Sequence, residues 1–243
     1  MTAETIAYAC GGRSYRGALV YNGSVTAPRP LMLISPNWLG VTAQAIRRAE
    51  TMAGDTYVAF VADMYGDGLC ASGPQDAAPL ADAVRADAPE RRRRIAAALD
   101  AMTSAAKERG IGDASRRAAV GFCFGGGNVL ELARAGADVQ AVVCLHGDLT
   151  SPLAAKPGDI RAALMVMHGS VDPVSPKAHR DAFEAEMDAA KARWQMLTFG
   201  GLVHSFCESE ANVPGIAEYD APAARQCYRL INLFIADAFA GRL

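Results

Sequence analysis

The segment Arg117-Ala-Ala-Val-Gly-Phe-Cys-Phe-Gly-Gly-Gly-Asn128 sets the architecture that we expect for the whole chain. An apolar run leads into Cys123, and a glycine-rich helix start follows it, so the segment predicts a strand, a sharp turn and a helix. A residue at the apex of such a turn has a strained backbone, with little room two positions to either side. Gly121 and Gly125 meet that demand because neither carries a Cβ atom.

This arrangement matches the nucleophile elbow, with cysteine in the place of the usual serine. The turn aims the sulfur of Cys123 outward at a helix N-terminus, where partial positive charge favours a thiolate. A structural alternative stays open, because a free cysteine also packs well as a small hydrophobic residue beside a helix start. Two nucleotide-binding motifs are excluded, since the segment has no Gly-x-Gly-x-x-Gly and no Lys-Ser/Thr after the glycines.

The length of 243 residues suits one large α/β domain or two small ones, and we expect a single α/β domain over residues 1–243. Hydrophobic residues make up 51% of the chain, which is ample for a sizeable core. The 24 basic and 26 acidic residues nearly cancel, so the net charge of -2 gives no support for nucleic-acid or membrane partners. No apolar run reaches the roughly 18 residues of a membrane span. No signal peptide is visible at the N-terminus, so we expect a cytoplasmic protein.

The six cysteines are scattered, and none of them forms a Cys-x-x-Cys motif. This distribution favours reduced thiols over a disulfide framework. Cys144-x-His146 is the nearest approach to a metal-binding pair, and two ligands at this spacing indicate a zinc site only weakly.

Apolar runs alternate with helical patterns along the chain. The expected strands are 6–9, 16–21, 31–35, 57–61, the run before Cys123, 139–145, 163–168 and 194–199. The expected helices are 42–52, 90–109, the segment from the elbow to 135, 176–190 and 219–239. Alternation of this kind predicts an α/β fold with a mostly parallel sheet of about eight strands and helices on both faces.

Two segments depart from this regular pattern. Residues 67–89 are rich in glycine and proline, and we expect an irregular, lid-like insertion with short helices. Arg91 to Arg94 fall in the first turns of the helix expected from residue 90, and a solvated helical face is their simplest interpretation.

In such sheets the functional site forms at the carboxyl ends of the strands. Cys123, Asp172 and His204 each follow a predicted strand, so we expect them at the same edge of the sheet. A thiol near neutral pH needs a base, imidazole is the usual one, and a carboxylate fixes the imidazole tautomer. The chain order nucleophile, acid, histidine is typical of α/β-hydrolases.

Each of these residues also has an ordinary structural interpretation. Asp172, before Pro173, is suited to starting a turn or capping a helix, and His204 is suited to bonding backbone in its glycine-bearing loop. His146 and His168 compete with His204, because they too follow strands. We favour His204 on chain order and on the reach of its loop.

An anionic tetrahedral intermediate needs hydrogen-bond donors. The backbone N–H of Phe124, which follows the nucleophile, is one expected donor. The second should come from the loop after the strand that ends at Ser35, which indicates the amide of Trp38.

These motifs together resemble the dienelactone hydrolase family of α/β-hydrolases. The resemblance rests on Gly-Phe-Cys123-Phe-Gly-Gly, Gly-x-x-Asp172-Pro, Gly-x-x-His204-Ser-Phe and Ala62-Asp-Met-Tyr-Gly66, and it extends from about Gly17 to Phe239. It implies an α/β-hydrolase fold with Cys123, Asp172 and His204 as catalytic triad and with an oxyanion hole formed by the amides of Trp38 and Phe124. It implies no metal and no organic cofactor.

Two positions depart from the members that cleave dienelactones. Those members carry a glutamate that helps to activate the thiol, where this chain has Asn37, which cannot take a proton. They also hold the substrate carboxylate with an arginine shortly after the histidine, where this chain has Glu208. Arg85 or one of Arg91 to Arg94 is a candidate replacement. We expect Asn37 and His146 to lie around the substrate or to support the catalytic groups.

The sequence therefore predicts a hydrolase of small carboxylic esters or lactones, acting as a monomer or a small homo-oligomer. The alternative is a non-hydrolytic member of the same fold that binds a ligand or senses oxidants through its thiol, because an accessible cysteine of low pKa serves either purpose.

Overall fold

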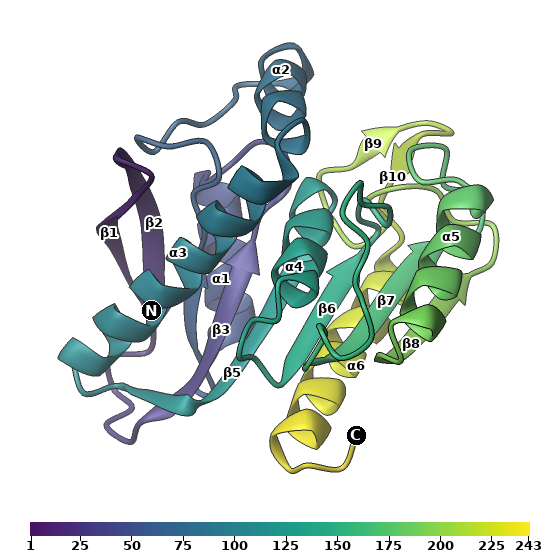
Figure 1. Cartoon of the computed structure of the whole chain (residues 1–243). Coiled ribbons are helices and arrows are strands. Elements are labelled where there is room, and N and C mark those ends of the chain that lie inside the picture. The colour runs from purple at the N-terminus through teal and green to yellow at the C-terminus, as the bar shows by residue number, and fades with distance from the viewer. The chain divides into compact units, whose positions relative to one another are not determined.

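The chain, described over residues 1–243 in a computed structural model, builds an eight-stranded sheet in the order β1-β2-β4-β3-β5-β6-β7-β8 (Figure 1). The strands are Thr2–Cys10 (β1), Arg13–Tyr21 (β2), Arg29–Ser35 (β3), Val58–Val61 (β4), Gly112–Phe122 (β5), Ala141–Leu145 (β6), Ala163–Gly169 (β7) and Arg193–Phe199 (β8). β1 pairs antiparallel with β2, and β2 antiparallel with β4. The pairs β3–β4, β6–β7 and β7–β8 are parallel. The predicted mostly parallel α/β fold is confirmed.

Contacts divide the chain into two compact units, residues 1–119 and 120–243. The helices of the first unit are Ala43–Ala53 (α1), Pro74–Arg85 (α2) and Ala88–Glu108 (α3). α3 packs on β1, β3 and β4, and α1 packs on β2 and β4 from the other face of these strands (Figure 1). All seven residues of β3 are buried, which accounts for its continuous apolar sequence.

Asp63 organises the loop that follows β4 in the first unit. Its carboxylate is almost fully buried and accepts four backbone N–H bonds, from Arg16, Tyr65, Gly66 and Gly68. The hydroxyl of Tyr65 then donates to the carbonyl of Trp38 at 2.7 Å. The Ala62 to Gly66 motif therefore fixes loop geometry, because a buried carboxylate must collect donors.

The helices of the second unit are Phe124–Arg134 (α4), Lys177–Ala189 (α5) and Ala221–Phe239 (α6). Of these, α4 packs on β6, and α6 packs on β6 and β7. A separate two-stranded hairpin, Asn212–Val213 (β9) with Ala217–Glu218 (β10), follows β8. None of the helices in the structure combines the length and apolarity needed to cross a bilayer.

Three local features add detail to the expectations or correct them. Within residues 67–89, where we expected irregular structure with short helices, residues 74–85 form one regular helix with Ala77, Ala81 and Val84 buried on one face. The β9–β10 hairpin was not expected. Arg91 is buried, and Arg94 donates to the carbonyl of Met64, so the arginine run is not simply a solvated face.

Candidate active site

Cys123 stands between β5 and α4 in the strained conformation expected of an elbow. Its φ is 53°, in the left-handed region that residues other than glycine seldom adopt, and its side chain is half-buried. A Cβ atom at Gly121 would lie 2.1 Å from the carbonyl oxygen of Gly125. Glycine is therefore required at 121, because real Cβ atoms do not approach backbone this closely.

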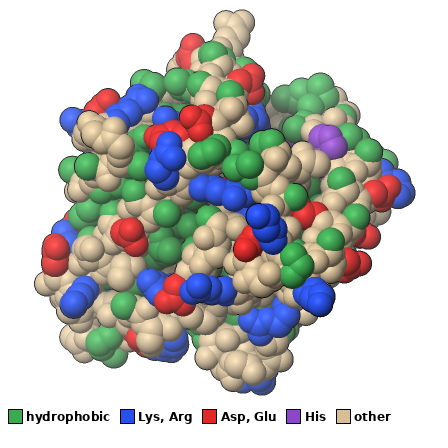
Figure 2. All heavy atoms as spheres, in the orientation of Figure 1, with side chains coloured by type: hydrophobic (Ala, Val, Ile, Leu, Met, Phe, Trp, Pro, Cys, Tyr) green, Lys and Arg blue, Asp and Glu red, His purple; other side chains and the backbone are tan.

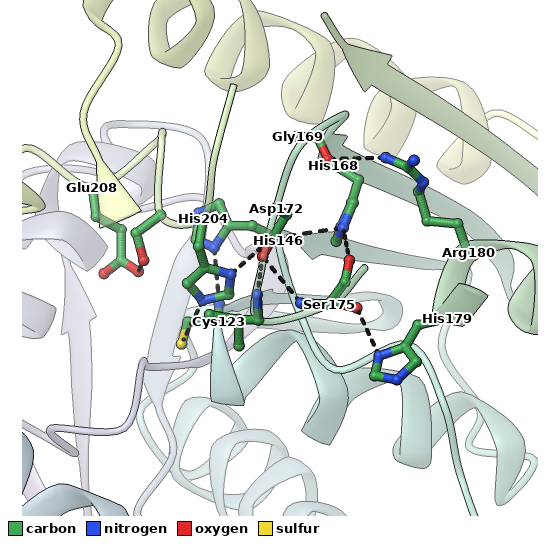
Figure 3. Close-up of polar contacts among 12 residues, drawn as sticks. Cys123, His146, His168, Gly169, Asp172, Ser175, His179, Arg180, His204 and Glu208 are labelled. Atoms are coloured by element: carbon green, nitrogen blue, oxygen red, sulfur yellow. Dashed lines mark hydrogen bonds and ion pairs between the residues drawn. The ribbon is translucent and has the colours of Figure 1, made fainter. Parts of the chain in front are cut away.

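The structure brings together the three residues that the sequence singled out (Figure 3). His204 Nε2 lies 3.1 Å from Cys123 Sγ, and His204 Nδ1 lies 2.8 Å from Asp172 Oδ2. A carboxylate only accepts hydrogen bonds, so Nδ1 donates to Asp172 and Nε2 is left to accept from the thiol. The arrangement suits transfer of a proton from sulfur to imidazole.

Asp172 is held in the turn between β7 and α5. Its Oδ1 accepts the backbone N–H groups of Val174 at 2.8 Å and Ser175 at 3.0 Å, which leaves Oδ2 for His204. The residue is only 3% exposed. With one oxygen fixed by backbone and the other facing the ring, the carboxylate orients the imidazole.

Burial and hydrogen bonding act in opposite directions on this pair. Burial alone would raise the pKa of Asp172, but the hydrogen bond and charge of His204 hold that pKa below its ordinary value. Burial alone would lower the pKa of His204, but the neighbouring sulfur of Cys123 and the bond to Asp172 raise it well above its ordinary value. The ring of His204 therefore takes a proton readily.

The backbone of His204 is fixed by the β9–β10 hairpin. Its N–H donates to the carbonyl of Ile216 at 3.0 Å, and its carbonyl accepts from the N–H of Glu218 at 3.1 Å. The hairpin thus places the histidine in a loop whose composition alone would allow many conformations.

The two competing histidines are buried, and each lies next to one member of the predicted triad. His168 is fully buried, and its Nε2 lies 2.7 Å from the Ser175 carbonyl and 3.6 Å from Asp172 Oδ2. Burial lowers the pKa of His168, against the opposing effect of the Ser175 bond. His146 is also fully buried, and its Nδ1 accepts the N–H of Cys123 at 3.2 Å.

The remaining predicted residues have these positions. Phe124 is the first residue of α4, directly after Cys123. In the first unit, Asn37 Oδ1 accepts the N–H of Leu39 at 3.1 Å and so closes the turn that contains Trp38. Glu208 is buried, and Ser205 Oγ donates to its carboxylate at 3.4 Å. The oxyanion role of Trp38 and Phe124 stays a prediction.

Sequence reasoning missed three supports of this site: the amides of Val174 and Ser175, the ring of His168, and the β9–β10 hairpin. The sequence gives a signal for the amides of Val174 and Ser175, since an aspartate in a turn commonly accepts backbone N–H groups two and three residues on. It gives none for the ring of His168 or for the hairpin, because both depend on segments that meet only in the fold. No three His, Cys, Asp or Glu side chains are grouped as a metal site would require.

Comparisons with known proteins show which sequences and structures this chain is similar to. A sequence model of the dienelactone hydrolase family matches residues 17–238. The solved structure of m3DLH has a TM-score of 0.89 at 30% identity, and the match covers 98% of both chains. The dienelactone hydrolase-like promiscuous phosphotriesterase P91, from metagenomic libraries, has a TM-score of 0.86 at 32% identity, again over 98% of both chains. The uncharacterized protein K02A2.1 of Caenorhabditis elegans is 33% identical over 147 residues, which span 58% of this chain and 92% of that protein.

Proposed function

Because the chain belongs to the dienelactone hydrolase family, we propose that it hydrolyses small carboxylic esters or lactones through a thioester on Cys123. The observation that carries the proposal is the position of one ring. His204 lies 3.1 Å from the sulfur on one side and 2.8 Å from a buried carboxylate on the other. Geometry of this kind supports a nucleophile, a base and a group that orients the base.

The proposed reaction has two halves. His204 Nε2 takes the proton of Cys123, and the thiolate adds to the substrate carbonyl carbon. The tetrahedral intermediate collapses, the carbon–oxygen bond breaks, and the leaving alkoxide takes the proton back from His204 as an alcohol. Water then gives a proton to His204 and adds to the thioester, the carbon–sulfur bond breaks, the carboxylic acid leaves, and His204 returns its proton to the sulfur of Cys123. Asp172 stabilises the imidazolium form of His204 in both halves.

The amide of Phe124 is proposed as one donor to the oxyanion, supported by its position at the N-terminus of α4 directly after the nucleophile. The amide of Trp38 is proposed as the second, on the family resemblance. Removing one such donor typically lowers kcat by about 10²–10³-fold.

For the substrate class we propose neutral esters and lactones over anionic ones. The support is Glu208, a buried carboxylate in the loop that carries His204, at the position where the sequence pattern of dienelactone-cleaving members has a cation. A second negative charge in the substrate would raise the energy of a buried carboxylate nearby.

Hydrolysis of phosphotriesters is a second candidate activity, favoured by the 32% identity to a protein described as a promiscuous phosphotriesterase. In this reaction the thiolate of Cys123 would add to phosphorus, and the leaving alkoxide would take the proton from His204. Water would then give a proton to His204 and add to phosphorus, the phosphorus–sulfur bond would break to release the phosphodiester, and His204 would return its proton to the sulfur. A neutral phosphotriester also fits the proposed preference for uncharged substrates.

The proposal is tested by replacing the nucleophile. Cys123→Ala should remain folded by circular dichroism and should lose hydrolysis of small activated esters by about 10³-fold or more. Cys70→Ala is the matched control, because Cys70 is exposed and lies outside the group of Cys123, Asp172 and His204. Hydrolysis by Cys123→Ala at the wild-type rate would refute the mechanism. A wild-type protein that turns over no ester, lactone or phosphotriester but oxidises reversibly at Cys123 would favour thiol sensing instead.

A further inference from the structure

His146 follows β6 in a conformation that requires support. Its φ is 38°, so it shares the left-handed region with Cys123, and the residue is completely buried. Strained backbone persists in proteins only where the surrounding structure holds it, and it gathers at functional sites. The contacts of His146 show what holds it.

The backbone at 146–147 is pressed against the helix that Cys123 caps. The N–H of His146 donates to the carbonyl of Met167 at 2.8 Å. A Cβ atom on Gly147 would lie 2.7 Å from the Cα of Gly126, in the first turn of α4. The segment after β6 and the start of α4 therefore approach each other with no space for side chains between them.

The ring of His146 contacts both partners of the proposed proton transfer (Figure 3). Its Nδ1 accepts the N–H of Cys123 at 3.2 Å, an N–H that is also shared with the carbonyl of Leu145 at 3.0 Å. The ring meets that of His204 edge to face, with centroids 5.3 Å apart and planes at 67°. On its other side it packs in the same way against Phe206, at 5.4 Å.

These contacts define the chemical form of the ring. A backbone N–H only donates, so Nδ1 must be a bare nitrogen, and the neutral ring then carries its proton on Nε2. Nδ1 faces an amide and not the sulfur. His146 therefore does not abstract the thiol proton, and any effect that it has on the reaction passes through Cys123 or His204.

We propose that His146 is a positioning residue for Cys123. By accepting the Cys123 N–H it fixes the peptide plane at the apex of the elbow, and with that the direction in which Sγ points toward His204. This role rests on the proposed function, in which Cys123 is the nucleophile.

Two variants distinguish the effect of the hydrogen-bond acceptor at His146 from the effect of the size of its ring. His146→Asn retains an acceptor near the Nδ1 position and suits a left-handed backbone, in which asparagine is enriched. His146→Phe retains an aromatic ring against His204 and Phe206 but has no acceptor. We expect His146→Asn to remain close to wild type, and His146→Phe to lose kcat by about 10²-fold with little change in KM, as for a displaced reacting group.

The deciding measurement is the rate at which iodoacetamide alkylates Cys123, followed by mass spectrometry on the peptide that carries it. We expect slow alkylation in His146→Phe and near-wild-type alkylation in His146→Asn, at equal melting temperatures. Wild-type alkylation in His146→Phe, or an equal loss in both variants, would overturn the proposal. Alkylation needs no ester substrate, so it still decides the role of His146 if the wild-type protein proves not to be an esterase.

A measurement on the unaltered protein covers the case in which a variant does not fold. Nitrogen-15 NMR of histidine-labelled wild-type protein should show His146 as a neutral ring with a bare Nδ1 and a protonated Nε2. A proton on Nδ1 of His146 would overturn the proposal, because the ring could not then accept the N–H of Cys123.

Discussion

The two nitrogens of His204 perform different tasks, and Asp172 decides which nitrogen performs which. Because Oδ1 of Asp172 is occupied by two backbone N–H groups, only Oδ2 faces the ring. A carboxylate there holds the proton on Nδ1 and leaves Nε2 bare toward the sulfur. An amide in the same place has a donor as well as an acceptor, so it no longer specifies the tautomer.

Asp172→Asn should therefore lower kcat by about 10⁴-fold, the loss seen when the aspartate of a serine triad is amidated. The pKa of His204 should fall as well, because its carboxylate partner is gone, and NMR titration of the ring measures this. Asp181→Asn is the matched control, since Asp181 is an exposed aspartate paired with Lys177 on α5. Retention of full activity and an unchanged His204 pKa in Asp172→Asn would contradict this account.

Single residues were predictable where the chemistry of the site constrains them. Cys123, Asp172 and His204 were identified because each follows an apolar run and because their order along the chain is characteristic. His168 and the amides of Val174 and Ser175 were not, since each acts through contacts with Asp172 that form only in the folded turn. The sequence showed which residue types occupy positions 37 and 208, but it did not show that Asn37 accepts from Leu39 or that Glu208 accepts from Ser205.

The junction of β5 and α4 depends on close approach of backbone. A Cβ atom at Gly121 would meet the Gly125 carbonyl oxygen at 2.1 Å, and neither group can move without distorting the turn at Cys123. Glycine at position 121 is therefore fixed by the packing of strand against helix.

Gly121→Ala should destabilise the protein by about 1–3 kcal/mol or more, as overpacking does, and should abolish activity by displacing Cys123. Gly200→Ala is the control, because a Cβ atom at Gly200 would have no other atom within 4 Å. The stability change in this control should stay within about 0.5 kcal/mol. Urea unfolding of both variants checks the expectation. Equal stability of the two variants would show that the elbow is more tolerant than its geometry indicates.

Helices and strands with a clear hydrophobic pattern were predicted well, and those with a weak pattern were not. The buried strands β3, β6 and β7 are continuous apolar runs, and the predicted positions agree with the structure to within a few residues. Short helices were expected in residues 67–89, but the bounds of α2 were not, because its buried face is made of Ala77, Ala81 and Val84 and because Pro79 lies inside it. The strands β9 and β10 have two residues each, too few to show any alternation.

Across the chain, Cys123, Asp172 and His204 all belong to the unit of residues 120–243. The alternation of strands and helices predicted the mostly parallel sheet. It did not predict that β4 would lie between β2 and β3, because strand order depends on how the chain crosses over after each strand. On the face of the molecule drawn in Figure 2, basic and acidic side chains are interspersed, in agreement with the small net charge.

Three buried groups in the unit of residues 120–243 make stability depend on pH, each in its own range. The pKa of His204 is raised, so its contribution is complete below about pH 6.5 and is lost as pH rises through the folded pKa. The pKa of Asp172 is lowered, so its contribution is present above about pH 3.9 and is lost as pH falls through the folded pKa. The pKa of His168 is lowered by burial, so stability is lost as pH falls below about 6.5 and the unfolded ring takes a proton.

Between about pH 6 and about pH 4.5, His168 is thus the member of this group whose contribution changes. His168→Gln should make the decline of the unfolding free energy in this range shallower, by at most about 1.4 kcal/mol per pH unit for one proton. The wild-type protein, titrated in parallel, gives the reference decline. Urea titrations across the range measure both, and an unchanged decline in His168→Gln would show that His168 is not held neutral by the fold.

The central claim is that Cys123 carries the acyl group during turnover. Intact-protein and peptide mass spectrometry, after rapid acid quench of the enzyme with an activated acetate ester, tests it most directly. We predict one added acetyl group on the peptide that contains Cys123. In Asp172→Asn this acetyl-enzyme should accumulate more strongly when the substitution slows loss of the acyl group more than its formation. Ester turnover without any acyl group on Cys123, together with turnover by Cys123→Ala at the wild-type rate, would contradict it.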